Sequence, residues 1–234
     1  MKVLAIGCHP DDCEIYCCGT LLKCKQRGDE VTVCHVANGN LGHVQIMPEE
    51  LRRVRIQEAQ DAGAIAGFKV RTVDIGDLRV YESDLNQLNA VVKVIREEKP
   101  DFIITHAPQD YMIDHRAVSE LVFKASFIAS VPHYDSELGE ATPTTPIYYM
   151  ETSSGLNFNP TEYVDITDVV ETKMQMLACH QSQYKWLMEH DNVDVAEQLR
   201  VSSRFRGIQC GVKYAEAFMQ EYCDHKVLPK RLLP

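Results

Sequence analysis

The sequence predicts an α/β fold, a doubly wound and mostly parallel sheet with helices on both faces. Short apolar segments alternate with segments of helical periodicity over the first half of the chain. Such alternation produces parallel strands joined by right-handed crossovers. The 234 residues are 45% hydrophobic and 25% charged, which fits one globular domain over residues 1–234 with a substantial core.

The first elements are placed by apolar runs and by the glycines that follow them. A strand is expected over residues 2–8, followed by a helix over 14–27 whose apolar residues recur at helical spacing. A β-rich run over 30–37 predicts the second strand. The charged, alanine-rich segment 48–67 ends at a glycine, as helices often do, and predicts the next helix.

Two further strand and helix pairs follow in the same order. Residues 69–75 form the third expected strand, and the segment 83–98 carries its apolar side chains on one helical side. After Pro100, the β-rich run 101–106 is the fourth expected strand. A helix is expected over 116–128.

The C-terminal third has a less regular pattern. Prolines mark loops around the strand-like segment 147–150. Helices are expected over 169–179, 193–204 and 212–220. Neither an internal repeat nor a low-complexity linker is present in the sequence.

Charge and cysteine content narrow the classes of partner and compartment. A formal net charge of -10 argues against a nucleic-acid partner, because phosphate backbones are bound by basic surfaces. The nine cysteines are an odd number in a chain of sufficient length for a core, so we expect reduced thiols. The apolar runs are too short for a membrane span or a signal peptide. We therefore expect a cytoplasmic protein with no membrane partner.

Two polar clusters follow the first and the fourth expected strands. His9-Pro10-Asp11-Asp12 comes directly after the first, and Asp110 to His115 comes after the fourth. If the strand order is 3-2-1-4-5, the order reverses between these two strands, and ligands bind at such a switch point. The two clusters are therefore expected to face one crevice.

Imidazole and carboxylate groups together suit a zinc ion. With Pro10 as the start of the helix, His9 and Asp12 are expected to reach one ion. Adding His115 gives three protein ligands and an open position for water, as in catalytic zinc sites. Asp11 would then accept a proton as the water attacks a carbonyl, which favours amide hydrolysis. The alternative is that Asp11 and Asp12 only cap a helix.

The chain resembles the zinc-dependent N-acetylglucosamine deacetylases of the PIG-L/LmbE-like family, in their bacillithiol-deacetylase-like bacterial branch. The resemblance covers nearly the whole length. It is carried by HPDD with Glu14 and Cys18-Gly19-Thr20, Asn38-Gly39 with Gly42, Arg55-Ile56-Gln57-Glu58-Ala59, Gly76-Asp77-Leu78, Asp110 to His115, Val164-Asp165-Ile166-Thr167 with Lys173, His180-Gln181-Ser182-Gln183, and Tyr214-Ala215-Glu216-Ala217-Phe218.

The resemblance implies roles for particular residues. It implies a Rossmann-like fold and an activity that removes the acetyl, or another N-acyl, group from an amino sugar or glycoconjugate. It also implies a homo-oligomer, either a trimer or a hexamer. The implied site residues are His9, Asp12 and His115 as zinc ligands, Asp11 as general base, Asp114 as a further catalytic carboxylate, and Arg55, Asn38 and Tyr111 as substrate-binding positions. For Arg55 and Asn38, a solvated helix charge and an ordinary turn are equally open interpretations.

One position departs from the family pattern. The family has His-Pro-Asp-His where this chain has Met112-Ile113-Asp114-His115. A thioether neither donates a proton nor hydrogen-bonds an oxyanion as a donor, and loss of one such donor typically costs about 10²- to 10³-fold in rate. Tyr111, His43 or His106 is a candidate replacement. The alternative function is a metal-dependent sugar-binding or regulatory homologue with weakened catalysis.

Overall fold

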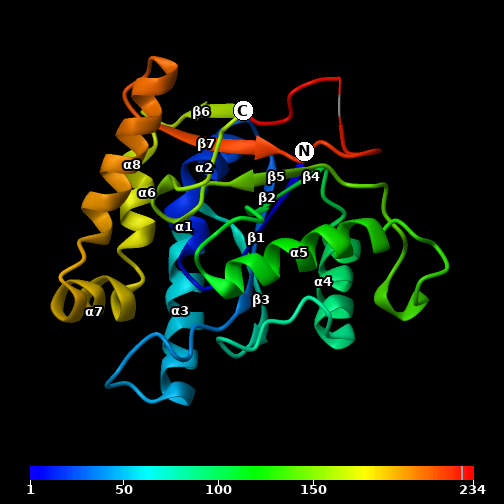
Figure 1. Cartoon of the computed structure of the whole chain (residues 1–234), viewed down its shortest axis with the longest axis horizontal. Coiled ribbons are helices and arrows are strands. Elements are labelled where there is room, and N and C mark those ends of the chain that lie inside the picture. Colours follow the sequence, from blue (N-terminus) through cyan, green and yellow to red (C-terminus); the bar gives the residue numbers. More distant parts are fainter. Residues whose placement is uncertain (228) are drawn as a thin grey trace.

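The computed structural model describes residues 1–227 and 229–234, and its strands form one sheet in the order β3-β2-β1-β4-β5-β7-β6 (Figure 1). Strands β1 to β5 pair in parallel, so the predicted α/β class and the order 3-2-1-4-5 are confirmed. The strands are β1 (Lys2–Gly7), β2 (Glu30–Ala37), β3 (Lys69–Ile75), β4 (Phe102–His106), β5 (Ile147–Met150), β6 (Glu162–Asp165) and β7 (Ala215–Gln220).

The sheet continues past β5 with an antiparallel pair that the sequence pattern did not reveal. Strand β7 pairs with β5 on one side and with β6 on the other, antiparallel in both cases. The helix predicted over 212–220 is therefore wrong, and β6 was not predicted. Ala215 to Phe218 are all buried between the two neighbouring strands. Pairing on both sides overrides the helix propensity of the alanines, glutamate and methionine in this segment.

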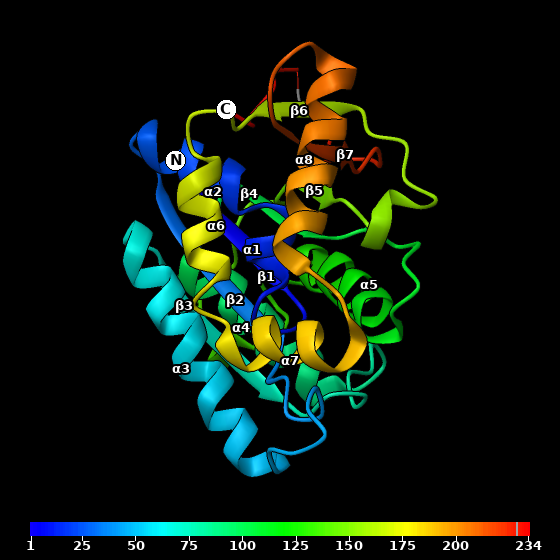
Figure 2. The same ribbon diagram turned by 90° about the vertical axis from the view of Figure 1, so that its left-hand side faces the viewer.

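Helices cover both faces of the sheet (Figures 1 and 2). Val3 and Ala5 of β1 pack in one core with side chains of α2, α3 and α6, and Leu4 and Ile6 pack in the other with α4 and α5. This is the alternation expected of a strand buried on both sides. The helices are α1 (Asp12–Tyr16), α2 (Cys18–Gln26), α3 (Pro48–Ala66), α4 (Leu85–Glu98), α5 (Ile113–Ile128), α6 (Val170–Leu177), α7 (Gln181–Asp191) and α8 (Val195–Cys210), with short 3₁₀ turns at Ser136–Leu138 and Ser153–Gly155.

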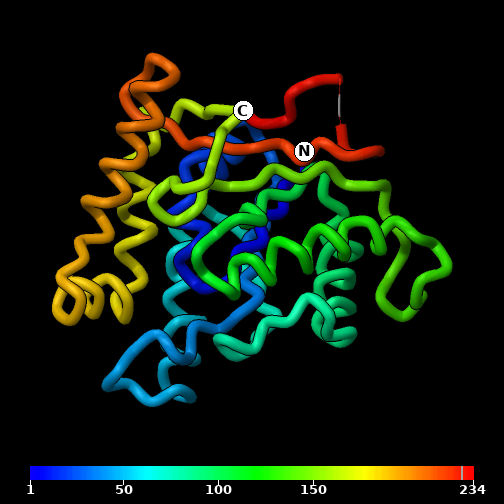
Figure 3. The backbone as a smooth tube through the Cα atoms, in the orientation of Figure 1, coloured from blue at the N-terminus to red at the C-terminus, as the bar shows by residue number. Residues whose placement is uncertain are grey.

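Most predicted helix bounds agree with the structure to within a few residues, but α7 was missed and α8 is longer than expected. The tube in Figure 3 shows both chain ends on the same side of the molecule. The carboxyl ends of β1 to β5 lie at one edge of the sheet, since these strands are parallel. The loops that follow them are therefore neighbours at that edge.

The helix expected over 14–27 is divided at Cys17 into α1 and α2. The carboxylate of Glu216 on β7 accepts hydrogen bonds from the backbone N–H groups of Gly19 (2.8 Å) and Thr20 (2.7 Å). A buried anion thus occupies the N-terminus of α2, where exposed N–H groups and the helix dipole favour negative charge. A Cβ atom at Gly19 would lie 2.9 Å from that carboxylate, so only glycine permits this approach.

Lys173 on α6 completes the buried charge pair. Its Nζ lies 2.5 Å from Glu216 Oε1 and donates to the carbonyl of Ile15 at 2.8 Å. Both side chains are almost completely buried. Glu216 and Lys173 therefore join β7, α6 and the α1–α2 junction.

We expect Glu216→Gln to lower the free energy of unfolding by about 3–5 kcal/mol, because Lys173 would keep a buried charge with no counter-ion. Urea denaturation followed by circular dichroism measures this change. The exposed pair of Lys99 and Glu140 provides the control, and Glu140→Gln should leave the unfolding free energy close to the wild-type value, because exposed ion pairs contribute little to stability. Equal effects of the two substitutions would contradict the structural role given to Glu216.

The described residues contain no helix that is both long and apolar enough to cross a membrane. All nine cysteines are free thiols, as expected. Burial raises the pKa of Cys8, Cys24 and Cys34 to about 12.

Candidate metal centre

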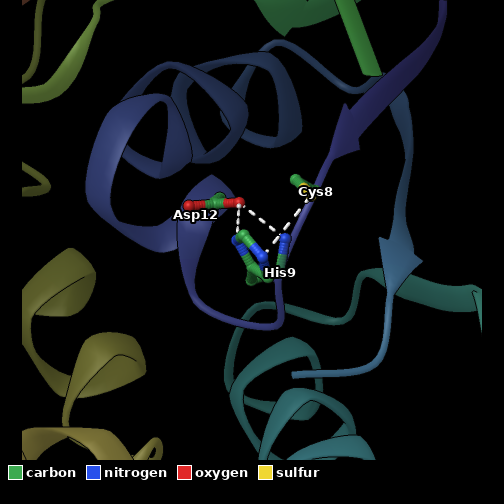
Figure 4. A group of neighbouring side chains, drawn as sticks. All are labelled: Cys8, His9 and Asp12. Atoms are coloured by element: carbon green, nitrogen blue, oxygen red, sulfur yellow. Dashed lines mark hydrogen bonds and ion pairs between the residues drawn. The ribbon is translucent and has the colours of Figure 1, made fainter. Parts of the chain in front are cut away.

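The loop between β1 and α1 carries the first polar cluster, beyond the carboxyl end of β1 (Figure 4). Helix α1 begins at Asp12, so the expectation that Pro10 starts the helix is wrong. Asp11 occupies the N-cap position with a φ of 128°, and its side chain makes no capping hydrogen bond. Helix capping therefore does not explain Asp11. A strained conformation of this kind at a non-glycine residue is typical of functional sites.

The side chains of His9, Asp12 and His115 meet at this edge of the sheet. Asp12 Oδ2 lies 3.4 Å from His9 Nδ1, and Asp12 Oδ1 lies 3.2 Å from His115 Nε2. The two imidazole centroids are 5.4 Å apart. All three side chains are buried, and the structure thus brings together residues separated by about a hundred positions in the chain.

A second carboxylate stands behind each of the two histidines. The Nε2 atom of His9, on the side of the ring away from Asp12, lies 3.5 Å from Asp114 Oδ2. The same Asp114 oxygen accepts a hydrogen bond from the Leu78 N–H at 2.8 Å. His115 Nδ1 lies 3.3 Å from Asp110 Oδ2. The carboxylates thus lie on the ring nitrogens that point away from the Asp12 carboxylate, and such partners fix the orientation of metal-binding imidazoles.

Among the residues that the structure describes, two overlapping groups of side chains could hold a metal ion. One contains Cys8, His9 and Asp12, and the other contains Asp12, His106 and His115. His106 Nε2 accepts a hydrogen bond from the Cys8 N–H at 2.9 Å, so its lone pair is already used. Its ring stacks on that of His115 with centroids 3.9 Å apart. His106 therefore supports the cluster from behind.

The charge state of the two stacked histidines differs. Burial and the neighbouring His115 lower the pKa of His106 to about 4. Burial also acts to lower the pKa of His115, but Asp12 and Asp110 outweigh it and raise that pKa to about 9. At neutral pH the protonated His115 thus lies between the carboxylates of Asp12 and Asp110. A metal cation bound there could replace this positive charge.

Asp11 is held by an arginine from α3. Arg55 Nη2 lies 3.0 Å from Asp11 Oδ2 and donates to the Pro10 carbonyl at 2.6 Å. Burial raises the pKa of Asp11, and the charge of Arg55 opposes that rise. Arg55 is only 3% exposed, so its charge serves Asp11 and the surrounding loops, and the open interpretation as a solvated helix charge is wrong.

The loop after β2 is fixed by carboxylates of β3 and of the loop that follows β3. Asn38 Nδ2 donates to Asp74 Oδ1 at 2.9 Å. Asp77 accepts from the N–H groups of Gly39 and Leu41 at 2.8 and 3.0 Å. Gly39 has a φ of 74°, and a Cβ there would lie 2.4 Å from Arg55 Nη1. Asn38 thus has a structural role, and its contact with substrate stays a prediction.

The candidates for replacing the family histidine lie in different surroundings. Tyr111 is 75% exposed, and Met112 is the half-buried N-cap of α5. His43 packs against Trp186 of α7 at 4.6 Å, and its Nδ1 accepts from two backbone N–H groups of its own loop. Of the three candidates, only His106 lies against the metal cluster, with its Nε2 3.2 Å from Asp12 Oδ2.

Several polar residues of the site received no role from the sequence pattern. They are Asp77, Asp110, Glu14 and His180, and the first two contact the cluster directly. His180 Nε2 lies 3.5 Å from Glu14 Oε2 in a buried pair. All four lie inside the motif segments of the sequence, but their partners come from other loops. Spacing along the chain therefore could not assign them.

The fold and the buried histidine and carboxylate cluster define an α/β protein with a candidate metal centre at the switch point of its sheet. The family described as GlcNAc-PI de-N-acetylase, PIG-L, matches residues 4–126 of the 234. The chain belongs to this family. It is thereby an enzyme of the hydrolase class that acts on N-acetyl amide bonds.

Individual relatives extend the likeness over most of the chain. A diacetylchitobiose deacetylase from Thermococcus kodakarensis is 29% identical over 229 residues, covering 92% of this chain and 81% of the relative. A probable N-acetyl-alpha-D-glucosaminyl L-malate deacetylase from Bacillus anthracis is 28% identical over 193 residues, covering 78% and 81%.

Solved structures share the fold. The N,N'-diacetylchitobiose deacetylase of Pyrococcus horikoshii has a TM-score of 0.83 at 25% identity, covering 94% of this chain and 83% of that one. The 4-carboxy-2-hydroxymuconate hydratase of Pseudomonas putida has a TM-score of 0.84 at 24% identity, covering 99% and 100%. The second likeness establishes the fold alone.

Proposed function

We propose that this protein is a zinc-dependent de-N-acetylase that removes an acetyl, or another N-acyl, group from an amino sugar or glycoconjugate. The observation that carries the proposal is the buried convergence of His9, Asp12 and His115 beside a separate carboxylate, Asp11. The names of the Thermococcus and Bacillus relatives, which specify acetylated amino sugars, support this substrate class. A homo-oligomer, trimer or hexamer, belongs to the same proposal, and light scattering measures it.

The donor set fits zinc. His115 Nε2 is buried and has no hydrogen-bond partner, although it lies 3.2 Å from an Asp12 oxygen. Two imidazole nitrogens and one carboxylate are a common catalytic zinc ligand set. We assign His9, Asp12 and His115 as the ligands, with Asp114 and Asp110 orienting the histidine rings. Zinc held there would supply Lewis acidity toward the amide carbonyl and activate water for attack.

Asp11 is the proposed general base. Its carboxylate is 14% exposed while Arg55 holds one oxygen, so the other oxygen can accept a proton from the attacking water. The Arg55 contact also fixes the unusual backbone at Asp11, and this fixed geometry places the base without further ordering during the reaction. Asp114 acts as a positioning residue in this scheme, since its carboxylate contacts the His9 ring and accepts a hydrogen bond from the Leu78 N–H. Tyr111 and Asn38 remain the proposed substrate contacts.

Asp11→Asn tests this assignment. We expect kcat on an N-acetylated amino sugar to fall about 10²- to 10⁴-fold, the usual contribution of a general base. The zinc content, measured by mass spectrometry, should stay at the wild-type value because Asp11 is not a ligand. Unchanged kcat would contradict the base role, and loss of zinc would move Asp11 into the ligand set.

A second candidate function is a metal-dependent sugar-binding or regulatory homologue with weakened catalysis. Met112 favours it, because its side chain offers no proton donor at the family's histidine position. Assays of the zinc-loaded protein on a panel of N-acetylated amino sugars separate the candidates. Binding of a sugar without turnover would support the second candidate.

A further inference from the structure

Exposed apolar residues lie on the loops at the carboxyl edge of the sheet, the edge that also carries the polar centre. They come from four loops or loop ends, those that follow β2, β3, β4 and β5. We call them the apolar rim. Its members, with their exposed fractions, are Leu41 (51%), Leu78 (57%), Tyr111 (75%), Ile113 (61%) and Leu156 (68%).

Each rim segment is tied to a carboxylate of the site. The N–H of Leu41 donates to Asp77 and the N–H of Leu78 donates to Asp114. Asp110 accepts from the N–H of Met112, next to Tyr111, and from the N–H of Ser153, in the turn that precedes Leu156. The rim therefore has a fixed position around the metal cluster.

Leu78 is the most informative member. It has a φ of 60°, a left-handed conformation that costs free energy for a bulky side chain and is easier for glycine or asparagine. It is also more than half exposed. Leu78 therefore contributes little to the core, and as one of several exposed apolar side chains at the same edge of the sheet it is available for a contact outside the folded chain.

We infer that the substrate is an N-acetylated amino-sugar glycoside with an apolar aglycone, and that the aglycone lies against the apolar rim while the amide reaches the metal centre. This inference rests on the proposed function. The five rim side chains offer a contact surface that a free polar sugar does not use. An alkyl or aryl aglycone uses it, because burial of each methylene is favourable.

The test compares the methyl and hexyl glycosides of N-acetylglucosamine on the zinc-loaded protein. We expect kcat/KM to be about 10-fold higher for the hexyl glycoside, mainly through a lower KM. The preference should fall below about 3-fold in Leu78→Asn, a substitution that suits the left-handed backbone and so keeps the loop folded. Tyr111→Ser provides a second variant on another loop.

Ile65→Asn is the matched control, since Ile65 is an exposed apolar residue at the far end of α3. This variant should keep the wild-type preference. Equal kcat/KM for the two glycosides would overturn the inference, as would a hexyl preference that Leu78→Asn leaves intact. A preference for N-hexanoylglucosamine over both glycosides would show that the rim takes an acyl chain instead.

Two further readouts separate this inference from its alternatives. If Leu78→Asn changes the oligomeric state by light scattering and leaves the hexyl preference intact, the rim is a contact between copies and the inference fails. If neither glycoside is hydrolysed, the proposed function fails, and calorimetric titration with the two glycosides still tests the rim. Equal binding of both would then overturn the inference independently.

Discussion

Asp12→Ala is expected to lower the zinc affinity by more than about 100-fold and to abolish the measurable deacetylase activity. Within the described part of the chain, Asp12 is the only carboxylate with an oxygen near a ring nitrogen of each of His9, His106 and His115. Its removal leaves two imidazoles without the anionic ligand between them. A supporting carboxylate typically changes metal affinity by only 10- to 100-fold, so the loss of a ligand should exceed that range.

Competition with a chromophoric chelator measures the affinity. Asp110→Asn is the matched control, because Asp110 contacts His115 Nδ1 on the opposite side of the ring, and we expect an affinity loss of about 10- to 100-fold. Thermal melting with and without zinc checks that Asp12→Ala is folded, since a ligand that binds only the native state raises the melting temperature. An affinity within tenfold of wild type for Asp12→Ala would refute the ligand assignment.

The parallel half of the sheet was predictable because its strands carry local patterns. Strands β1 and β4 are short apolar runs buried on both faces, and β2 and β3 agree with the predicted bounds. The antiparallel extension was not predictable in the same way. Residues 215–220 become a strand because β5 and β6 are available on either side, and that information is not local.

The metal cluster, like the sheet, was predictable from the sequence only where its pattern is local. The spacing of His9 and Asp12 is a local pattern, and the strand order brought His115 opposite them. The supporting contacts depend on loops distant in sequence, such as Asp114 behind His9, and on the backbone of Asp11, whose φ of 128° no local pattern indicates. The proposed ligands could therefore be predicted from short motifs, whereas the residues that orient them could be identified only from the folded structure.

Met112→His should raise kcat on an N-acetylated amino sugar by up to about 10²-fold. Met112 is the N-cap of α5, three positions before His115, and its N–H is bonded to Asp110. A histidine at this position restores a side chain that can donate a proton to the leaving amine or hydrogen-bond the developing oxyanion. Each of these contributions is typically worth about 10²-fold or more.

Steady-state kinetics on the zinc-loaded proteins measures this effect, with Met112→Leu as the control for changes in packing alone. Met112→Leu should keep the wild-type kcat, since leucine also lacks a donor. A wild-type protein without turnover that gains turnover with Met112→His would support the sugar-binding alternative for the natural chain. Equal kcat in all three proteins would show that another group already supplies the missing function.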